Sequence, residues 1–297
     1  MSSSNVLGVK LATLRINGGT RAARIEDDAA VLLDAPDVGA LLGDERYLEL
    51  RSAAGERVTL ANCDFAPVIP HPDKILCVGL NYRSHVLEMG NELPKYPTVF
   101  AKFRGSLVGA HDNVVLPAVS KSVDWEAELT VIIGKPARHV SVADAPNYLA
   151  GYTIMNDVSI RDWQRRTSQF LQGKTFESST PLGPWLVTVD DLSVAGFAVS
   201  GADGAQPDAR TKISCSVNGE VLQDSFTSDL VFDVATIVSY LSTVITLLPG
   251  DVIATGTPGG VGAGRTPPRF LADGDEMETA IGGIGVMRNR CVQEVLG

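Results

Sequence analysis

The chain has 297 residues, of which 44% are hydrophobic and 20% charged, an ordinary composition for a globular protein with a substantial core. Its 25 Lys and Arg against 35 Asp and Glu give a net charge of −10, which argues against nucleic acid or an anionic membrane as a partner. An anionic small substrate is still compatible with this charge, because a few local cations or a metal ion can reverse the sign of one cleft.

Targeting and cysteine patterns point to the cytoplasm. The N-terminal residues lack the basic stretch, apolar core and cleavage site of a signal peptide. The longest apolar stretch, around 231–248, is interrupted by Asp233 and by Thr and Ser, so no membrane span is expected. The cysteines are far apart in the sequence and form no CxxC pair: Cys63, Cys77, Cys215 and Cys291. We therefore expect a cytoplasmic protein with buried free thiols.

The first part of the chain predicts a small N-terminal domain. Short strands are expected over 8–33, with a hairpin turn at Asn17-Gly18-Gly19, and short helices are expected from Asp37 and over 47–53. Prolines at 67, 70 and 72 then punctuate the chain. This pattern divides the protein into a small N-terminal α/β domain, residues 1–70, and a main domain, residues 71–297.

The main domain is predicted to be rich in strands, with few helices. Strands are expected over 75–79, 98–103, 106–110, 128–133, 150–155, 213–217 and 221–224, and helical segments over 82–89, 159–167 and from 234. Asn218-Gly219 supplies the clearest hairpin signal, and Asp233 is placed to cap the last helix. The fold class predicted for the whole chain is therefore a β-rich α+β protein.

Two glutamates two residues apart form a candidate metal site. Glu126 and Glu128 lie at the start of a predicted strand, where residues two apart point to the same face. Asp157 follows the strand over 150–155 and could complete a set of three carboxylates. Oxygen ligands without a nearby His or Cys favour Mg²⁺ or Mn²⁺ over zinc. The spacing alone leaves a second interpretation open, a solvated strand edge with two surface glutamates.

A series of short motifs carries a resemblance to a known family. In chain order they are Gly79-Leu80-Asn81-Tyr82 with His85, Trp125-Glu126-Ala127-Glu128-Leu129, Asn156-Asp157-Val158-Ser159 with Arg161-Asp162, Gly173-Lys174-Thr175-Phe176, Leu182-Gly183-Pro184, Asn218-Gly219, Leu248-Pro249-Gly250-Asp251 and Ile253-Ala254-Thr255-Gly256-Thr257-Pro258. From about Lys74 to the C-terminus the chain resembles the fumarylacetoacetate hydrolase family, of the bacterial two-domain type similar to 2-hydroxyhepta-2,4-diene-1,7-dioate isomerase and acylpyruvate hydrolase.

The resemblance implies a mixed β-roll for the main domain and a homodimer. It also implies that Glu126, Glu128 and Asp157 hold Mg²⁺ or Mn²⁺, and that the substrate is a small anionic 2-oxo or diketo acid. A 2-oxo acid binds such a metal through its carboxylate and keto oxygens, and the metal stabilises the enolate that forms when the adjacent bond breaks.

The resemblance also assigns roles to other side chains. His85 and Glu88 correspond to the family's lid dyad, in which Glu88 orients His85 and His85 takes a proton from water. Lys174 corresponds to a lysine that stabilises the developing oxyanion. Residues expected to border the substrate are Lys102, Arg161, Gln164 and Thr257. For Arg161 a structural role, as a partner of Asp162 or of a metal ligand, is an equal alternative.

The leading functional hypothesis is a metal-dependent hydrolase that cleaves a C–C bond in an acylpyruvate or 1,3-diketo acid, in aromatic or sugar-acid catabolism. Two alternatives use the same site: an oxaloacetate-type decarboxylase and a 2-hydroxyhepta-2,4-diene-1,7-dioate isomerase. A catalytically silent metal-binding protein is a further alternative. The retention of His85, Glu88 and Lys174 argues against it.

Overall fold

The computed structural model describes residues 9–88, 90, 92–189 and 211–296. Four N-terminal strands run antiparallel to their neighbours: β1 (Lys10–Ile16), β2 (Gly19–Glu26), β3 (Ala29–Leu32) and β4 (Arg57–Thr59). The β1–β2 turn places Asn17 and Gly18 at φ angles of 51° and 80°, as the predicted hairpin requires. Two short helices follow β3, α1 (Val38–Gly43) and α2 (Tyr47–Leu50). The Asp37 side chain caps α1 by accepting from the Ala40 N–H at 2.8 Å.

An 11-stranded sheet runs through the molecule in the order β4-β3-β2-β1-β13-β11-β10-β16-β5-β6, and β7 pairs with β13. Its other members are β5 (Ile75–Gly79), β6 (Thr98–Lys102), β7 (Leu107–Val108), β10 (Ala127–Ile133), β11 (Leu149–Asn156), β13 (Thr180–Thr188) and β16 (Val252–Ala254). Every residue of β10 and β11 is buried, including polar ones such as Glu128 and Asn156.

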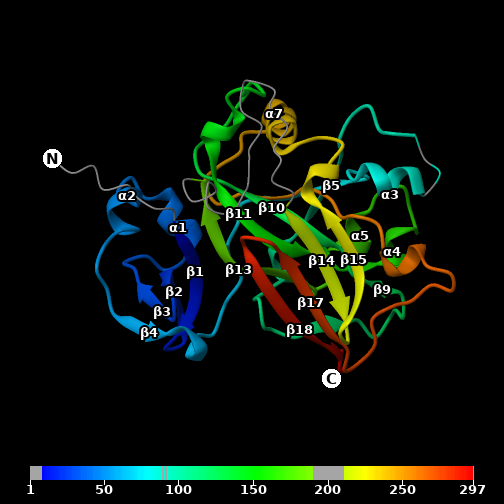
Figure 1. The fold of residues 1–297 in the computed structure, drawn as a ribbon, viewed down its shortest axis with the longest axis horizontal. Helices are drawn as coiled ribbons and strands as arrows, with labels where there is room; N and C mark the ends of the chain where they lie inside the picture. The colour runs from blue at the N-terminus through cyan, green and yellow to red at the C-terminus, as the bar shows by residue number, and fades with distance from the viewer. Residues whose placement is uncertain (1–8, 89, 91, 190–210, 297) are drawn as a thin grey trace.

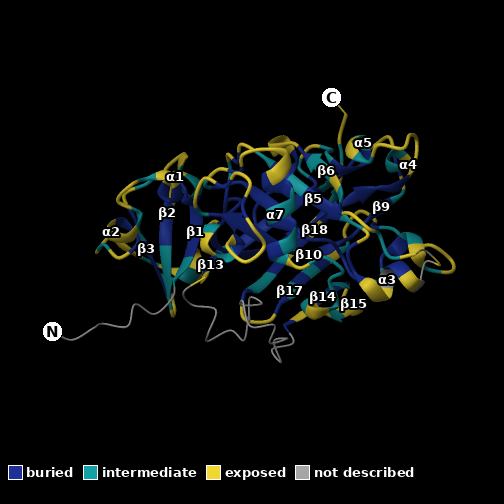
Figure 2. Ribbon diagram, turned by 90° about the horizontal axis from the view of Figure 1, so that it is seen from above, coloured by how far each residue is buried: buried dark blue, intermediate teal, exposed yellow. Residues whose placement is uncertain are grey.

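A five-stranded sheet forms the second layer, in the order β15-β14-β17-β18-β8. Its strands are β8 (Val114–Leu116), β14 (Lys212–Val217), β15 (Glu220–Phe226), β17 (Glu276–Ile281) and β18 (Gly285–Gln293). Two very short strands, β9 (Val123–Asp124) and β12 (Ser159–Ile160), pair with each other beside the site described below. Buried residues concentrate in the strands between the layers, and exposed residues lie in the loops and peripheral helices (Figure 2).

Three short helices lie at the end of the molecule opposite β1–β4: α3 (Arg83–Glu88), α4 (Arg161–Gln164) and α5 (Leu171–Lys174) (Figures 1 and 2). The longer helix α7 (Val234–Val244) begins at Asp233, whose side chain accepts from the Thr236 N–H at 2.8 Å. Within the described residues, no helix is both long and apolar enough to cross a membrane.

The β-rich α+β class predicted from the sequence is confirmed, with two local differences. The strand expected over 106–110 is only the two residues of β7, because Arg104–Ser106 form a 3-10 turn before it. The helical segment expected over 159–167 begins instead as β12, whose Ser159 pairs with Asp124, and only α4 is helical. The division at residue 70 stays a prediction. In the structure β1 pairs with β13, so the N-terminal strands extend the main sheet.

Candidate functional site

Three buried carboxylates meet where β10 and β11 lie side by side. Glu128 belongs to β10, Glu126 directly precedes it, and Asp157 directly follows β11. The antiparallel register sets Ala127 opposite Asn156, and the Asp157 N–H donates to the Glu126 carbonyl at 2.8 Å. One carboxylate oxygen from each of the three acids lies within 4.8 Å of the others. The structure therefore brings together the three predicted metal ligands.

Two buried lysines neutralise part of this negative charge. Lys174 Nζ lies 2.6 Å from Glu126 Oε2 and 2.7 Å from Asp157 Oδ2, and Lys102 Nζ lies 2.7 Å from Asp157 Oδ1. Each lysine residue is only 2% exposed. Lys174 lines the cavity beside the carboxylates, whereas Lys102 is not one of the described residues that line it. This places Lys102 as a partner of Asp157.

Arg161 joins the carboxylates to a fourth acid that the sequence prediction missed. Its guanidinium lies 2.7 Å from Glu126 Oε1 and 2.8 Å from Asp124 Oδ2, and it also donates to Gln164 Oε1 at 2.9 Å. Asp162, the alternative partner considered for Arg161, accepts instead from Ser120. Asp124 is fully buried and lies two residues before Glu126. The alternation that singled out Glu126 and Glu128 could therefore have included it.

Asp124 also fixes one wall of the site. Its carboxylate accepts from the backbone N–H groups of Gly262 and Ala263 at 2.6 and 3.0 Å. A Cβ on Gly262 would come within 1.8 Å of the Arg269 carbonyl oxygen, so only glycine fits this close approach. The 262–264 turn is thereby held against the same acid that orients Arg161.

The surroundings of the acids shift their proton affinities in opposite directions. Burial raises the pKa of Glu128 well above its usual range, and the charges on Asp157 and Glu126 add to that rise. Burial opposes ionisation of Asp157 too, but Lys102 and Lys174 outweigh it and lower the pKa of Asp157 to about 2. Burial likewise disfavours the charged form of Lys174, yet Asp157 and Glu126 raise its pKa above the usual lysine range. Glu126 and Asp157 are therefore paired with lysines, whereas Glu128 pairs with no cation among the described residues.

The donor set fits a hard divalent cation. Ligand oxygens on one Mg²⁺ are separated by at most about 4.2 Å, and those on a larger cation by about 5 Å, so a 4.8 Å spread needs little adjustment. All three donors are carboxylates, which suits Mg²⁺ or Mn²⁺ and not a thiolate-preferring ion. A divalent cation would also supply the positive charge that Glu128 lacks. These observations support the predicted cofactor class without separating Mg²⁺ from Mn²⁺.

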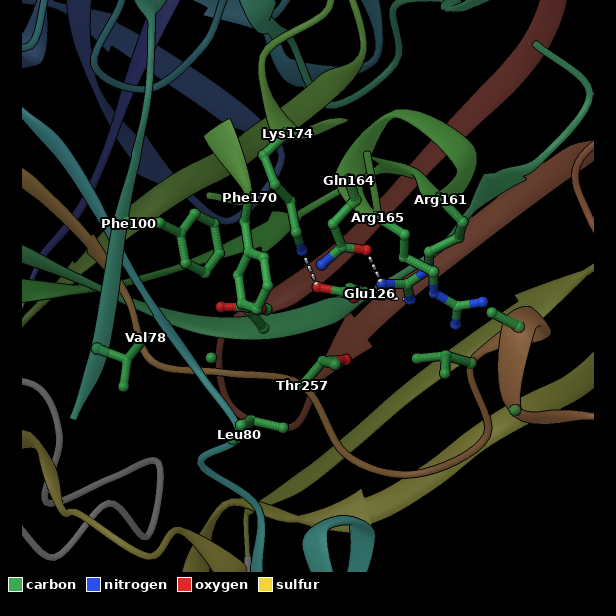
Figure 3. Close-up of a pocket in the computed structure, with 15 residues that line it drawn as sticks. Val78, Leu80, Phe100, Glu126, Arg161, Gln164, Arg165, Phe170, Lys174 and Thr257 are labelled. Atoms are coloured by element: carbon green, nitrogen blue, oxygen red, sulfur yellow. Dashed lines mark hydrogen bonds and ion pairs between the residues drawn. The ribbon is translucent and has the colours of Figure 1, made fainter. Parts of the chain in front are cut away.

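A cavity of about 140 Å³ opens beside the carboxylates. Figure 3 shows Glu126, Lys174, Arg161 and Gln164 together on one side of it, with Phe100 and Phe170 nearby. The two phenyl rings meet edge to face, with centroids 5.8 Å apart. The acidic and basic side chains that line this cavity suit a small anionic acid held with a metal ion.

Thr257 lines the cavity, but its hydroxyl is already engaged. Oγ1 donates to the Ala127 carbonyl at 2.9 Å and accepts from Gln223 Nε2 at 2.8 Å. Gln223 also accepts from the Ala127 N–H at 2.9 Å, so it ties β10 to the Thr257 loop. Nothing in the sequence around Gln223 signalled this role. That Thr257 borders the substrate stays a prediction, and donation to the substrate would require its hydroxyl to turn away from Ala127.

The predicted dyad lies on α3, whose backbone is described to Glu88. The side chains of His85 and Glu88 lie outside the described residues. The segment before them is firmly held: the Asn81 side chain donates to the carbonyls of Thr255 at 2.7 Å and Phe232 at 3.0 Å. This attaches the start of α3 to the Thr255–Thr257 loop of the cavity.

Comparisons with known proteins agree on one family. A sequence model described as "Fumarylacetoacetate (FAA) hydrolase C-terminal" matches residues 74–292. The rat protein "Oxaloacetate tautomerase Fahd2a, mitochondrial" is 45% identical over 229 residues, 77% of this chain and 69% of the relative. The human "Oxaloacetate tautomerase FAHD2A, mitochondrial" is 46% identical over 230 residues, again 77% and 69%.

Solved structures extend the similarity over nearly the whole chain. A putative HpcE protein from Mycobacterium smegmatis is 36% identical with a TM-score of 0.83, and covers 96% of this chain and 100% of that one. A fumarylacetoacetate hydrolase from Exiguobacterium antarcticum is 32% identical with a TM-score of 0.82 and the same coverage. A 2-hydroxyhepta-2,4-diene-1,7-dioate isomerase from Mycobacterium marinum is 32% identical with a TM-score of 0.77, covering 97% and 100%.

Proposed function

The chain belongs to the fumarylacetoacetate hydrolase family, and from that membership we propose that it is a divalent-metal-dependent enzyme that interconverts the keto and enol forms of a small 2-oxo acid of the oxaloacetate type. The observation that carries the proposal is the meeting of Glu126, Glu128 and Asp157 with Lys174 at the side of a small cavity. Relatives 41–46% identical bear the name oxaloacetate tautomerase, and similar solved structures include a 5-carboxymethyl-2-hydroxymuconate delta-isomerase and a 2-hydroxyhepta-2,4-diene-1,7-dioate isomerase.

The charges of the site suit an anionic oxo acid. Four enclosed acids, Asp124, Glu126, Glu128 and Asp157, face three enclosed cations, Lys102, Arg161 and Lys174, so one negative charge is in excess once Glu128 ionises to bind a metal. Glu126, Glu128 and Asp157 would hold the divalent cation, which would supply Lewis-acid polarisation of the oxo acid and make the net charge of the site positive.

The chain's own residues provide the rest of the proposed chemistry. Lys174 stays protonated because of its acidic partners, so its ammonium can donate to the oxygen that gains charge as the enolate forms. Arg161 holds Glu126 in place through Oε1 and leaves Oε2 toward Lys174. The aromatic rings of Phe100 and Phe170 add apolar surface beside these charged groups.

The C–C bond hydrolase predicted from the sequence is the second candidate. It is favoured by the similarity to the Exiguobacterium fumarylacetoacetate hydrolase. It requires a base that activates water, and His85 oriented by Glu88 is the proposed pair. Both reactions, and decarboxylation, pass through an enolate, so the carboxylate site serves each of them.

Parallel assays of a substrate panel separate these activities. The purified protein is given oxaloacetate, an acylpyruvate and 2-hydroxyhepta-2,4-diene-1,7-dioate, with Mg²⁺ or Mn²⁺ and with a chelator. We expect metal-dependent loss of enol absorbance with oxaloacetate, faster than in buffer alone and without release of CO₂. Cleavage of the acylpyruvate alone would assign the hydrolase, and CO₂ release alone the decarboxylase. No turnover of any of the three would support the non-catalytic alternative.

Compartment and assembly stay proposals. The cytoplasm expected in the sequence analysis stays a proposal, and the curated tautomerase relatives carry "mitochondrial" in their names. A homodimer is proposed from the family resemblance.

A further inference from the structure

One cationic side chain on the cavity wall is not used by the carboxylate cluster. Among the described residues that line the cavity, the cations are Lys174, Arg161 and Arg165. The first two are bound to Glu126. Arg165 forms no ion pair with any described residue, and its side chain is exposed. It is therefore available to a ligand.

The backbone of Arg165 is fixed, although its side chain pairs with no residue that the structure describes. Arg165 is the C-cap residue that follows α4, and its N–H donates to the Arg161 carbonyl at 3.1 Å. Residues four apart in a helix lie on one face with about 5–6 Å between their Cβ atoms. Figure 3 shows Arg165 beside Arg161 and Gln164 on the cavity wall. Helix α4 and its C-cap thus place Arg161 against Glu126 and Arg165 next to it on the cavity wall.

Apart from its cations, Gln164 and Thr257, the side chains that line the cavity offer little to a second negative charge. Val78, Leu80, Phe100, Phe170 and Val261 contribute apolar surface to the lining. An acid with a carboxylate at each end would place one end at the metal and Lys174. Its other end would then lie in this apolar region unless it reached Arg165. Burying a carboxylate without a partner is strongly unfavourable.

We propose that Arg165 is a specificity-determining residue that binds the distal carboxylate of a short 2-oxo dicarboxylic acid. The inference rests on the proposed function, which places the 2-oxo acid head at Glu126, Glu128, Asp157 and Lys174. Arg165 lines the same cavity as Glu126, Glu128 and Lys174, so a short diacid with its head at these groups can direct its distal carboxylate toward Arg165. Acids with an apolar tail in place of the distal carboxylate would gain nothing from Arg165.

The test compares two unreactive probes with the same head. N-oxalylglycine and N-ethyloxamate both present an oxalyl group to the metal site, but only the first carries a distal carboxylate. Their affinities for the Mg²⁺-loaded protein are measured by calorimetry in the wild type and in Arg165→Gln. Arg166→Gln is the matched control, because the neighbouring Arg166 lies over the Trp163 ring at 3.5 Å and is not among the described residues that line the cavity. Arg165→Lys tests whether a cation alone restores binding.

In the wild type we expect N-oxalylglycine to bind at least about tenfold more tightly than N-ethyloxamate. Arg165→Gln should lose about 10- to 100-fold of the affinity for N-oxalylglycine and change that for N-ethyloxamate by less than about twofold, with partial recovery in Arg165→Lys. Equal affinities for both probes in the wild type, or equal losses in Arg165→Gln and Arg166→Gln, would overturn the inference alone. If neither probe binds the wild type although Mg²⁺ does, the proposed function is wrong and the inference with it.

Discussion

At the scale of single residues, the carboxyl group of Glu128 experiences two opposing demands. It is 2% exposed, its Oε2 accepts one hydrogen bond from the Gly256 N–H at 2.8 Å, and it forms no ion pair with a described residue. Without a metal, burial and the neighbouring acids therefore favour its protonated form. A divalent cation needs the ionised form. Proton and metal thus compete for the same group.

Glu128→Gln separates the two demands. Glutamine has the shape of a protonated glutamate and can keep the Gly256 hydrogen bond, so the metal-free variant should be as stable as the wild type or more stable at neutral pH. Its affinity for Mg²⁺ or Mn²⁺ should fall about a hundredfold or more, because a buried charge partner of the metal is lost. Calorimetric titration measures the affinity, and thermal unfolding in a chelator measures the stability. The exposed Glu177→Gln is the control and should change neither.

The pH dependence of the same pair of proteins has a definite sign. The folded state keeps a proton on Glu128 above the ordinary glutamate pKa of 4.5, whereas the unfolded chain has lost it. The stability of the metal-free wild type should therefore fall as pH rises above 4.5, and Glu128→Gln should lack this component. Asp157 does not interfere, because its stabilisation is lost only as pH falls below 3.8 toward its folded pKa of about 2. A variant with the same Tm dependence as the wild type between about pH 5 and 8 would contradict the assignment.

The sequence could predict those parts of the site that depend on local patterns, but not the contacts between residues far apart in the chain. Alternation along one strand singled out Glu126 and Glu128, and would have included Asp124 if applied one step earlier. The contact between Lys102 and Asp157 joins residues 55 apart, so only the family resemblance suggested a lysine there. Gln223 lies 96 residues from Ala127, and a single glutamine in a hairpin carries no signal of such a bond.

At the scale of elements, α3 is attached to the segment around η5 (Thr227–Asp229). The Asp229 carboxylate accepts from the Ser84 N–H at 3.0 Å and from the Ser84 hydroxyl. Just before α3, Tyr82 forms a β-bridge with Leu230. Asp229 thus acts for the first turn of α3 as an N-cap residue supplied from a distant part of the chain. A helix of six residues has little stability of its own and depends on such contacts.

Asp229→Ala should loosen α3 and leave the carboxylate site intact. Loss of a capping interaction is worth about 1 kcal/mol, so amides of 83–88 should exchange with solvent roughly five- to tenfold faster. Turnover should fall if α3 carries the dyad, whereas metal affinity should not change. Hydrogen exchange by mass spectrometry and metal titration measure the two effects. Asp224→Asn is the control, since Asp224 lies on β15 in an exposed pair with Lys212. Unchanged exchange over 83–88 would show that Asp229 does not hold the helix.

Elements with local signals were predicted well. The β14–β15 hairpin turns at Asn218 and Gly219, whose φ angles of 53° and 79° are those that this dipeptide favours. Helix α7 begins at the predicted cap, Asp233. By contrast, the two-residue strands β9 and β12 exist only because segments 35 residues apart pair, so no local pattern marks them.

At the scale of the whole molecule, the N-terminal strands are continuous with the main sheet. Lys10 of β1 pairs with Val187 of β13, a contact between residues 177 apart that alternation within either strand cannot predict. The two parts also share a core cluster in which Leu11 and Leu41 pack with residues such as Ile132 and Leu186. Arg15 reaches Asp112 of the main part through two hydrogen bonds, one of them 2.9 Å long. These contacts predict that the two proposed domains unfold together.

Leu41→Ala tests this coupling, because the reporters lie on the other side of the proposed boundary. All three tryptophans, Trp125, Trp163 and Trp185, belong to residues 71–297. Leu41 is fully buried in α1, so its truncation should cost about 2–5 kcal/mol. If the parts unfold as one unit, the urea midpoint reported by tryptophan fluorescence falls accordingly with an unchanged slope. Leu48→Ala, at a position 66% exposed in α2, should leave the midpoint unchanged. A tryptophan midpoint that Leu41→Ala does not move would show that residues 1–70 unfold independently of the main domain.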